Sequence, residues 1–438
     1  MDSNPPSRRV ATGAEYRQGL AQVVARSRVI LCAGSGGVGK TTVAASLALA
    51  GASMGRRTLV VTIDPAKRLA VALGVREMGH QEVLVPGLPV HCGEAESARF
   101  TSNGLECTSA GRDGLGGDPD EEGRGHGALY AMMLDQKSAF DEVVDKYSSD
   151  PAARARIAES RIYQQIACTL SGAHEYAALA KLDQLDRERR YDLIVVDTPP
   201  TAHALDFLEA PARIMEALDS PAVGWFTKPL LATGRFSLLT IGKGSSFVMK
   251  RLAKLVGSAF LEDMARFFIE SAEVLAGFRE RARRVQELLC DRAVSFVVVT
   301  VPEPAALDEA LLVHRRLVTA GMKVGAMVVN RVHRVAPSAP PVDELVGCLA
   351  NCPACQSFGR AELDCAAQAM LASHEEIGAL ASANQQEIAR ARSATSEKTP
   401  FVGIPFLDQD VFTVEQLAKL GAWLLRPGDL SDYVAVAK

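Results

Sequence analysis

A glycine-rich segment between an apolar run and a helical run is the feature that most constrains this chain. Residues 28–33 (RVILCA) predict a short buried strand, and residues 42–54 place small and apolar side chains at helical spacing. The segment between them matches the pattern Gly-x4-Gly-Lys-Thr and comprises Gly34, Ser35, Gly36, Gly37, Val38, Gly39, Lys40 and Thr41. A preceding strand and a following helix are the context in which this pattern forms a phosphate-binding loop.

The residue types in this loop suit phosphate chemistry. Glycines let the backbone N–H groups of residues 36–39 point at β-phosphate oxygens, and the N-terminus of the helix adds positive potential. Lys40 supplies a point charge to the β- and γ-phosphates, and the Thr41 hydroxyl can bind Mg²⁺. An ordinary glycine-rich turn is the alternative, and the strand–loop–helix context disfavours it.

Further apolar runs predict the fold class. They are expected to form strands at residues 57–63, 191–196, 293–301, 322–329 and 401–404. Helical stretches separate nearly all of them, and strands that are apolar on both faces are typical of a parallel sheet covered on both sides. We therefore expect an α/β fold with a mainly parallel, doubly wound sheet.

The chain is predicted to form one phosphate-loop domain over residues 28–427, between an N-terminal extension (1–27) and a C-terminal tail (428–438). Within it we expect a mobile Gly-rich insertion (101–127), two helical blocks that form one inserted subdomain (128–189 and 211–289) and a cysteine-containing insertion (333–400). The last insertion is predicted to contain two helices, at residues 361–373 and 375–392.

Composition excludes several classes of protein. The 48 Lys and Arg residues against 52 Asp and Glu residues give a net charge of −4, without the basic excess that nucleic-acid binding requires. No transmembrane segment is predicted, because no run approaches the ~18 apolar residues of a spanning helix. Residues 1–27 lack the apolar core of a secretory signal, and most of the nine cysteines are scattered. We predict a cytoplasmic protein that does not act on nucleic acid.

Two aspartates follow apolar runs and are candidates for the chemistry. Asp197 is placed to reach the Mg²⁺ shell through a water molecule beside Thr41, and capping of the next helix is the alternative. Asp64 ends another predicted strand at the same sheet edge, where it can orient or deprotonate an attacking water. Its alternative role is that of a turn residue before Pro65.

Four segments, residues 35–42, 64–66, 197–205 and 328–330, together resemble the ArsA-type ATPase family. That family includes the catalytic subunits of arsenite pumps and the ATPases that target tail-anchored membrane proteins. The resemblance implies a P-loop NTPase fold of the SIMIBI class and hydrolysis of Mg-ATP. It also implies that Asp64 activates the water and that Asp197 holds Mg²⁺ through water.

The same resemblance extends the nucleotide site. It adds Thr42 to the phosphate loop, identifies Asn330 as the residue that reads adenine, and places Pro405 and Phe406 in the loop that closes over the base. From the residues alone, Asn330 could equally cap a turn. His174, His203 and His333 form no ligand set, and we predict that they are structural.

One position departs from the family pattern. Members usually carry a signature lysine at the second loop position, which reaches the partner's phosphates across a dimer, and Ser35 stands there in this chain. A charge of that kind can contribute several kcal/mol to phosphoryl transfer. We therefore expect slow hydrolysis, or hydrolysis that uses another cation.

Cys352 and Cys355 form a C-x2-C pair, 22 residues beyond Asn330. Such a pair supplies two ligands of a thiolate metal site, and the ATPases that target tail-anchored proteins share one Zn²⁺ between two chains through a comparable pair. Reduced structural thiols and a redox pair are the alternatives.

Three functional hypotheses follow. The first is a nucleotide-switched dimer, formed with a second copy or with a paralogous ATPase. It would shelter a hydrophobic or membrane-protein client on the apolar side chains of residues 211–289. A packed core is the alternative explanation for those side chains. The second is the ATPase subunit of an arsenite or oxyanion efflux pump, although such subunits usually duplicate the ATPase within one chain. The third is a weakly hydrolysing scaffold ATPase that works with a paralogue, which Ser35 keeps open.

Overall fold

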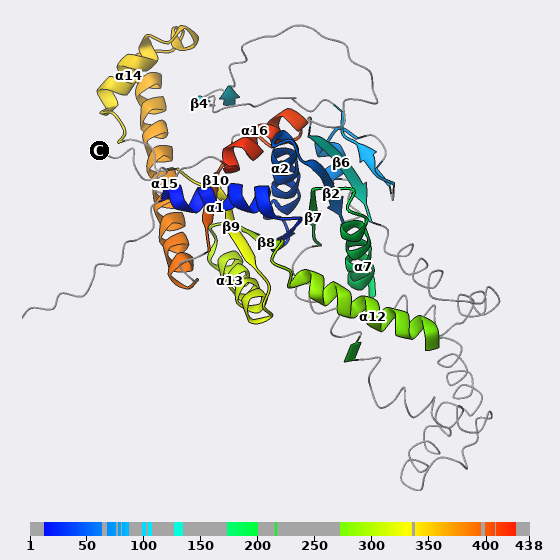
Figure 1. Cartoon of the computed structure of the whole chain (residues 1–438). Coiled ribbons are helices and arrows are strands. Elements are labelled where there is room, and N and C mark those ends of the chain that lie inside the picture. Colours follow the sequence, from blue (N-terminus) through cyan, green and yellow to red (C-terminus); the bar gives the residue numbers. More distant parts are fainter. Residues whose placement is uncertain are drawn as a thin grey trace, which may run out of the picture.

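An eight-stranded sheet forms the centre of the computed structural model, with strand order β10-β9-β8-β1-β7-β2-β6-β3 (Figure 1). The structure describes residues 13–63, 68–75, 78–79, 81–86, 99–101, 104–106, 127–134, 173–199, 215–216, 272–334, 338–395, 399–407 and 409–425. The sheet strands are β1 (Val29–Ala33), β2 (Arg57–Thr62), β3 (Val83–Leu84), β6 (Ala128–Met133), β7 (Leu193–Asp197), β8 (Val294–Thr300), β9 (Val324–Val332) and β10 (Phe401–Pro405). Two short strands, β4 (Arg99–Thr101) and β5 (Gly104–Glu106), pair separately.

All neighbouring strands of the sheet run parallel except β3, which pairs antiparallel with β6. Every residue of β1, β7, β8 and β10 is buried, as expected for strands covered on both faces. The mainly parallel α/β sheet predicted from the apolar runs is therefore confirmed. The carboxyl ends of β1, β7, β8 and β9 meet at one edge of this sheet.

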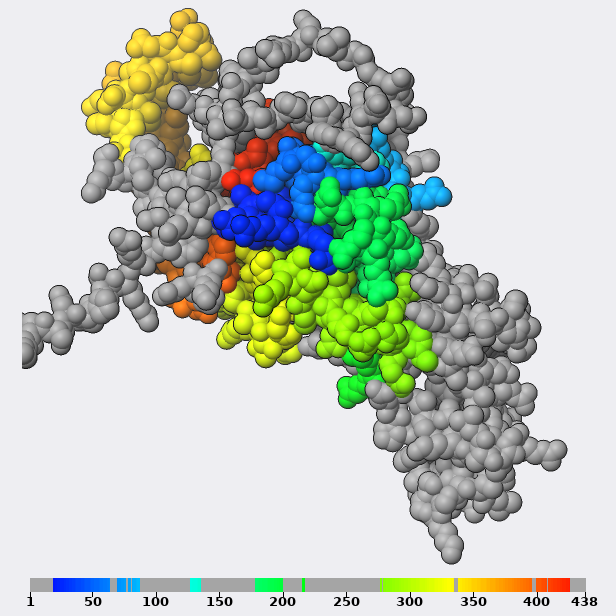
Figure 2. All heavy atoms as spheres, in the orientation of Figure 1, coloured from blue at the N-terminus to red at the C-terminus, as the bar shows by residue number. Residues whose placement is uncertain are grey.

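Nine α-helices and one 3-10 turn lie within the described ranges: α1 (Gly13–Arg26), α2 (Lys40–Ser53), α3 (Arg68–Ala72), α7 (Ala173–Glu188), α12 (Ala272–Leu289), α13 (Pro304–Thr319), α14 (Val342–Ala350), η1 (Pro353–Cys355), α15 (Arg360–Ser393) and α16 (Val414–Leu425). Helices α1, α2 and α16 pack together, whereas α13 packs against β8 and β9 (Figure 1). The α14 end of the α14–α15 hairpin projects from the body of the protein, as the yellow residues of Figure 2 show.

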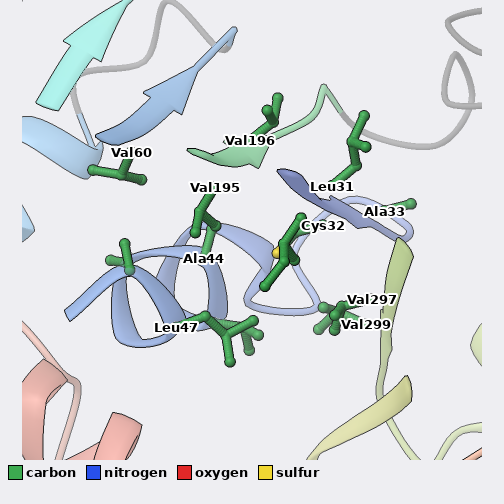
Figure 3. Close-up of a cluster of buried hydrophobic side chains, with 14 of the residues drawn as sticks. Leu31, Cys32, Ala33, Ala44, Leu47, Val60, Val195, Val196, Val297 and Val299 are labelled. Carbon is green, nitrogen blue, oxygen red and sulfur yellow. The ribbon is translucent and has the colours of Figure 1, made fainter. Parts of the chain in front are cut away.

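Helix α2 is apolar on every side because two layers enclose it. Figure 3 shows Cys32 and Val195 on the sheet face that α2 covers, while Leu31 and Val196 point to the opposite face. This alternation is the period of two expected along a strand. The other side of α2 packs against α16, so the helix that begins at the phosphate loop is held in the main core.

Gly421 of α16 lies directly against the backbone of α2. A Cβ atom built there would lie 2.4 Å from the backbone oxygen of Ser46, which cannot move without disturbing α2. We expect Gly421→Ala to lower the free energy of unfolding by about 1–3 kcal/mol, measured by urea denaturation. Gly378→Ala on α15 is the matched control, since that site is open, and it should be neutral or stabilise by up to about 1 kcal/mol. Equal midpoints for the two variants would contradict this packing.

Three expectations about the elements are corrected. Residues 128–133 were expected to be helical, but they form β6 parallel to β2, because pairing with a neighbouring strand overrides the weak local preference of ALYAMM. The two helices expected at 361–373 and 375–392 are one helix, α15, since no glycine or proline separates them. The expected N-terminal extension contains α1, whose Leu20 and Val24 are buried in the main core.

Several predicted segments lie outside the described residues. They are residues 102–103 and 107–126 of the Gly-rich insertion, most of the two helical blocks (135–172, 211–214 and 217–271) and the tail at 428–438. Helix α7 ends the first block and helix α12 ends the second, and these two helices pack against each other. In the part of the chain that the structure describes, no helix combines the length and the apolar character that crossing a membrane requires.

Candidate nucleotide-binding site

The loop between β1 and α2 lies at the carboxyl edge of the sheet, where its glycines are sterically required. A Cβ at Gly34 would lie 2.0 Å from the carbonyl oxygen of Val299 on β8, so the loop can leave the sheet here only without a side chain. Gly39 precedes the first residue of α2 with φ of 95°, in the left-handed region that glycine tolerates. The predicted strand–loop–helix unit is thus present.

Lys40 points back over the loop. Its side chain is only 7% exposed, and Nζ donates to the carbonyl oxygen of Ser35 at 2.8 Å. The ammonium group therefore lies against the backbone of the phosphate loop. Its position agrees with the predicted role of binding phosphate oxygens.

Thr41 and Asp197 are brought together from opposite parts of the sequence. The Thr41 hydroxyl donates to Asp197 Oδ2 at 2.7 Å, and the Thr62 hydroxyl at the end of β2 lies 3.3 Å from the same oxygen. Asp197 is the last residue of β7 and is 1% exposed. A hydroxyl and a carboxylate beside a phosphate loop are hard oxygen donors, and they fit the chemistry of Mg²⁺.

Charge at this edge also affects Cys32 on β1. Burial and the neighbouring Asp197 carboxylate raise the pKa of the Cys32 thiol well above its usual range, while Lys40 acts in the opposite direction. The thiol therefore stays neutral at physiological pH. Cys32 contributes to the site through its backbone, because its carbonyl oxygen accepts the Thr198 hydroxyl at 2.8 Å.

Asn330 ties β9 to the phosphate loop. Its Nδ2 donates to the carbonyl oxygen of Val38 at 2.9 Å, and its Oδ1 accepts the backbone N–H of Arg331 at the same distance. Arg331 has φ of 58°, so the amide also stabilises a left-handed backbone at this strand end. Both the loop contact and the turn contact are thus made by one side chain.

Pro405 and Phe406 lie at the carboxyl end of β10, next to the end of β9. The backbone N–H of Phe406 donates to the carbonyl oxygen of Val332 at 2.9 Å. The Phe406 ring stacks on His333, with centroids 4.9 Å apart and planes 14° from parallel. The sequence showed no role for His333 beyond a structural one, although it stands three residues after Asn330 at the same strand end.

Cys352 and Cys355 lie away from this edge, at η1 between α14 and α15. The backbone N–H of Cys355 donates to the Cys352 carbonyl oxygen at 2.9 Å, and burial together with the Cys352 thiol raises the pKa of Cys355. Among the residues described, no three His, Cys, Asp or Glu side chains are grouped so that they could hold a metal ion. The described part of one chain therefore does not support a zinc site.

Asp64 lies outside the described residues, in the gap 64–67 that follows β2. The preceding strand ends beside Asp197, because Thr62 pairs with it in register. The role of Asp64 remains a prediction.

A parallel sheet, a glycine loop after a central strand, a buried lysine above it and a Thr–Asp pair at the adjoining strand end define a P-loop nucleotide-binding protein. A family model described as "Anion-transporting ATPase" matches residues 27–96 and 126–338, more than half of the chain. The chain belongs to this ArsA-type ATPase family, which confirms the resemblance found in the sequence.

Individual relatives are distant. Over 309 residues, 70% of this chain and 63% of the relative, the chain is 26% identical to a putative arsenical pump-driving ATPase 1 of Aquifex aeolicus. An uncharacterised protein of Streptomyces coelicolor is 29% identical over 72% of this chain and 64% of its own length. The ATPase GET3 of Malassezia globosa is 26% identical over 69% of this chain and 72% of its length. The match spans less than two thirds of the first two proteins.

Proposed function

We propose that this chain binds Mg-ATP and hydrolyses it to ADP and phosphate. The observation that carries the proposal is the 2.7 Å contact between the Thr41 hydroxyl and the Asp197 carboxylate, directly beside the phosphate loop. Thr41 would bind Mg²⁺ and Asp197 would hold it through water, while Lys40 binds the β- and γ-phosphates. Bound Mg²⁺ would neutralise charge that develops on the phosphate oxygens. Asp64 is proposed to orient the attacking water.

Slow turnover is part of this proposal. Ser35 offers no charge to a partner's phosphates, and its carbonyl oxygen accepts Lys40 instead. The stabilisation of the transition state that a second cation would provide is therefore missing unless another residue supplies it.

Asp197→Asn tests the magnesium assignment. The substitution keeps the shape of the side chain but removes the charge that holds metal-bound water, so we expect the Mg²⁺ concentration for half-maximal ATP binding to rise about 10- to 100-fold. Isothermal titration at several Mg²⁺ concentrations measures this, with ADP binding in EDTA as the control. An unchanged Mg²⁺ requirement would remove Asp197 from the metal site.

We further propose that the ATPase works as a nucleotide-switched dimer that targets or shelters hydrophobic or membrane-protein clients. The family membership, the likeness to an ATPase GET3 and the presence of one phosphate loop in the sequence support this role. An efflux-pump subunit is the second candidate, because another relative is named a putative arsenical pump-driving ATPase.

Co-purification in the presence of a slowly hydrolysed ATP analogue separates these roles. Recovery of membrane proteins with single hydrophobic segments would support targeting, whereas a polytopic permease would support the pump. Recovery of a second ATPase of the same family would favour a heterodimer and a scaffold role. Light scattering with and without the analogue tests the dimer, and a monomer under both conditions would contradict it.

A further inference from the structure

The carboxyl ends of β9 and β10 carry an aromatic pair, His333 and Phe406. Their rings are stacked at 4.9 Å, and Phe406 remains 53% exposed. His333 therefore covers one face of the Phe406 ring, while more than half of the residue stays exposed to solvent. Stacking of this kind limits the rotamers of both side chains before any ligand arrives.

A third residue fixes the orientation of His333. Asn384 Oδ1 lies 3.1 Å from the backbone nitrogen of His333 and 3.1 Å from its Nδ1. The oxygen accepts both groups when the ring carries its proton on Nδ1, so the ring is held by two bonds to one side chain. Asn384 belongs to α15, which lies beyond the residues matched by the family model.

The body of the protein holds α15 at this point. Ile388 and Ala391, on the C-terminal half of α15, belong to the main core, and α15 packs against α13 and β9. The other half packs against α14 through Leu363 and Ala367. Asn384 therefore connects the half of α15 that packs on the core to the end of β9.

The aromatic pair lies at the carboxyl ends of two strands on the same side of the sheet edge as the phosphate loop. In the sheet order, β9 and β10 are the second and third strands from β1, roughly 10–14 Å away at ordinary strand spacing. Asn330, three residues before His333, reaches back to Val38 of the loop. A nucleoside triphosphate extending across these strand ends would bring its base to an exposed aromatic ring, and such rings stack on bases.

We infer that His333 is a positioning residue that holds Phe406 against the nucleotide base, and that Asn384 links the α14–α15 hairpin to this contact. The inference rests on the proposed ATP binding. By linkage, a contact from α15 that favours binding of the base is itself favoured when the base is bound.

His333→Ala tests the inference in the full-length chain. We expect the Kd of Mg-ATP, and the KM of hydrolysis, to rise roughly three- to tenfold with kcat nearly unchanged. Inorganic tripolyphosphate with Mg²⁺ has no base, so its inhibition constant should not change. Asn384→Ala should also raise the Kd of Mg-ATP. His333→Phe keeps an aromatic ring stacked on Phe406, so its affinity for ATP should stay close to that of the natural chain. His374→Ala, on α15 but away from the pair, is the matched control.

The outcomes are separable. If the natural chain binds no ATP, the proposed function itself fails. If it binds ATP and the affinity is unchanged in both His333→Ala and Asn384→Ala, the positioning role is wrong. Equal weakening of ATP and tripolyphosphate would also overturn it, because that result shows distortion of the phosphate loop rather than loss of base stacking. Should His333→Ala not fold, Asn384→Ala carries the same comparison of ATP with tripolyphosphate, and unchanged affinity for ATP in that variant overturns the positioning role.

Discussion

Lys40→Ala is expected to abolish measurable ATP binding. Lys40 is buried and its ammonium group donates to the loop carbonyl of Ser35, so we expect this charge to bind the β- and γ-phosphates. Each charge-assisted hydrogen bond contributes about 1.5–3 kcal/mol, so loss of the bonds to two phosphates should weaken binding by roughly 100- to 10,000-fold. Isothermal titration with Mg-ATP measures the effect, and retained tight binding would show that the loop is not the nucleotide site.

A second lysine provides the control for this experiment. Lys323 is exposed just before β9 begins, at the opposite edge of the sheet from the loop. Lys323→Ala changes the net charge equally but should leave the Kd unchanged. Comparable thermal midpoints of the two variants would exclude loss of folding as the cause.

Asp64→Asn is expected to preserve ATP binding and to reduce turnover by about 100- to 10,000-fold, the range that general-base catalysis supplies. The amide cannot accept the proton or orient the water as a carboxylate does, whereas the phosphate contacts of Lys40 and the loop are untouched. Phosphate release under saturating ATP measures turnover, and the Kd measured in parallel checks that binding is intact.

The matched control is Asp343→Asn on α14, where the side chain is 97% exposed. It removes one carboxylate far from the loop and should leave both the turnover rate and the Kd of ATP unchanged. Turnover that survives in Asp64→Asn at the natural rate would require another residue to activate the water. The same variant, if it retains ATP, also provides a trapped state for the co-purification experiment.

Local patterns were sufficient for much of the fold and for the position of the glycine-rich loop between β1 and α2. Residues 34–41 could be predicted to form a phosphate loop, because glycines, a lysine and a threonine at this spacing between a strand and a helix are typical of such a loop. The strands around them are continuous apolar runs, which is the signature of a sheet buried on both faces. Asp197 could be placed beside Thr41 for the same reason, since parallel strands end at a common edge.

Other features depend on contacts between distant segments. Residues 128–133 become a strand because β2 offers a partner, and α1 joins the core because α16, β9 and β10 cover its apolar side. Neither outcome can be predicted from a short stretch of sequence. The helix and strand propensities of these residues differ by less free energy than their packing against other elements contributes.

The nucleotide site divides in the same way. The phosphate loop and the Thr41–Asp197 pair could be read from the order of residues, because backbone geometry alone brings them together. The assembly of His333, Phe406 and Asn384 could not, since Asn384 lies 51 residues beyond His333 and Phe406 follows a later strand, β10. Stacking and hydrogen-bond geometry of that kind exist only once the sheet order and the packing of α15 have brought the three side chains within reach.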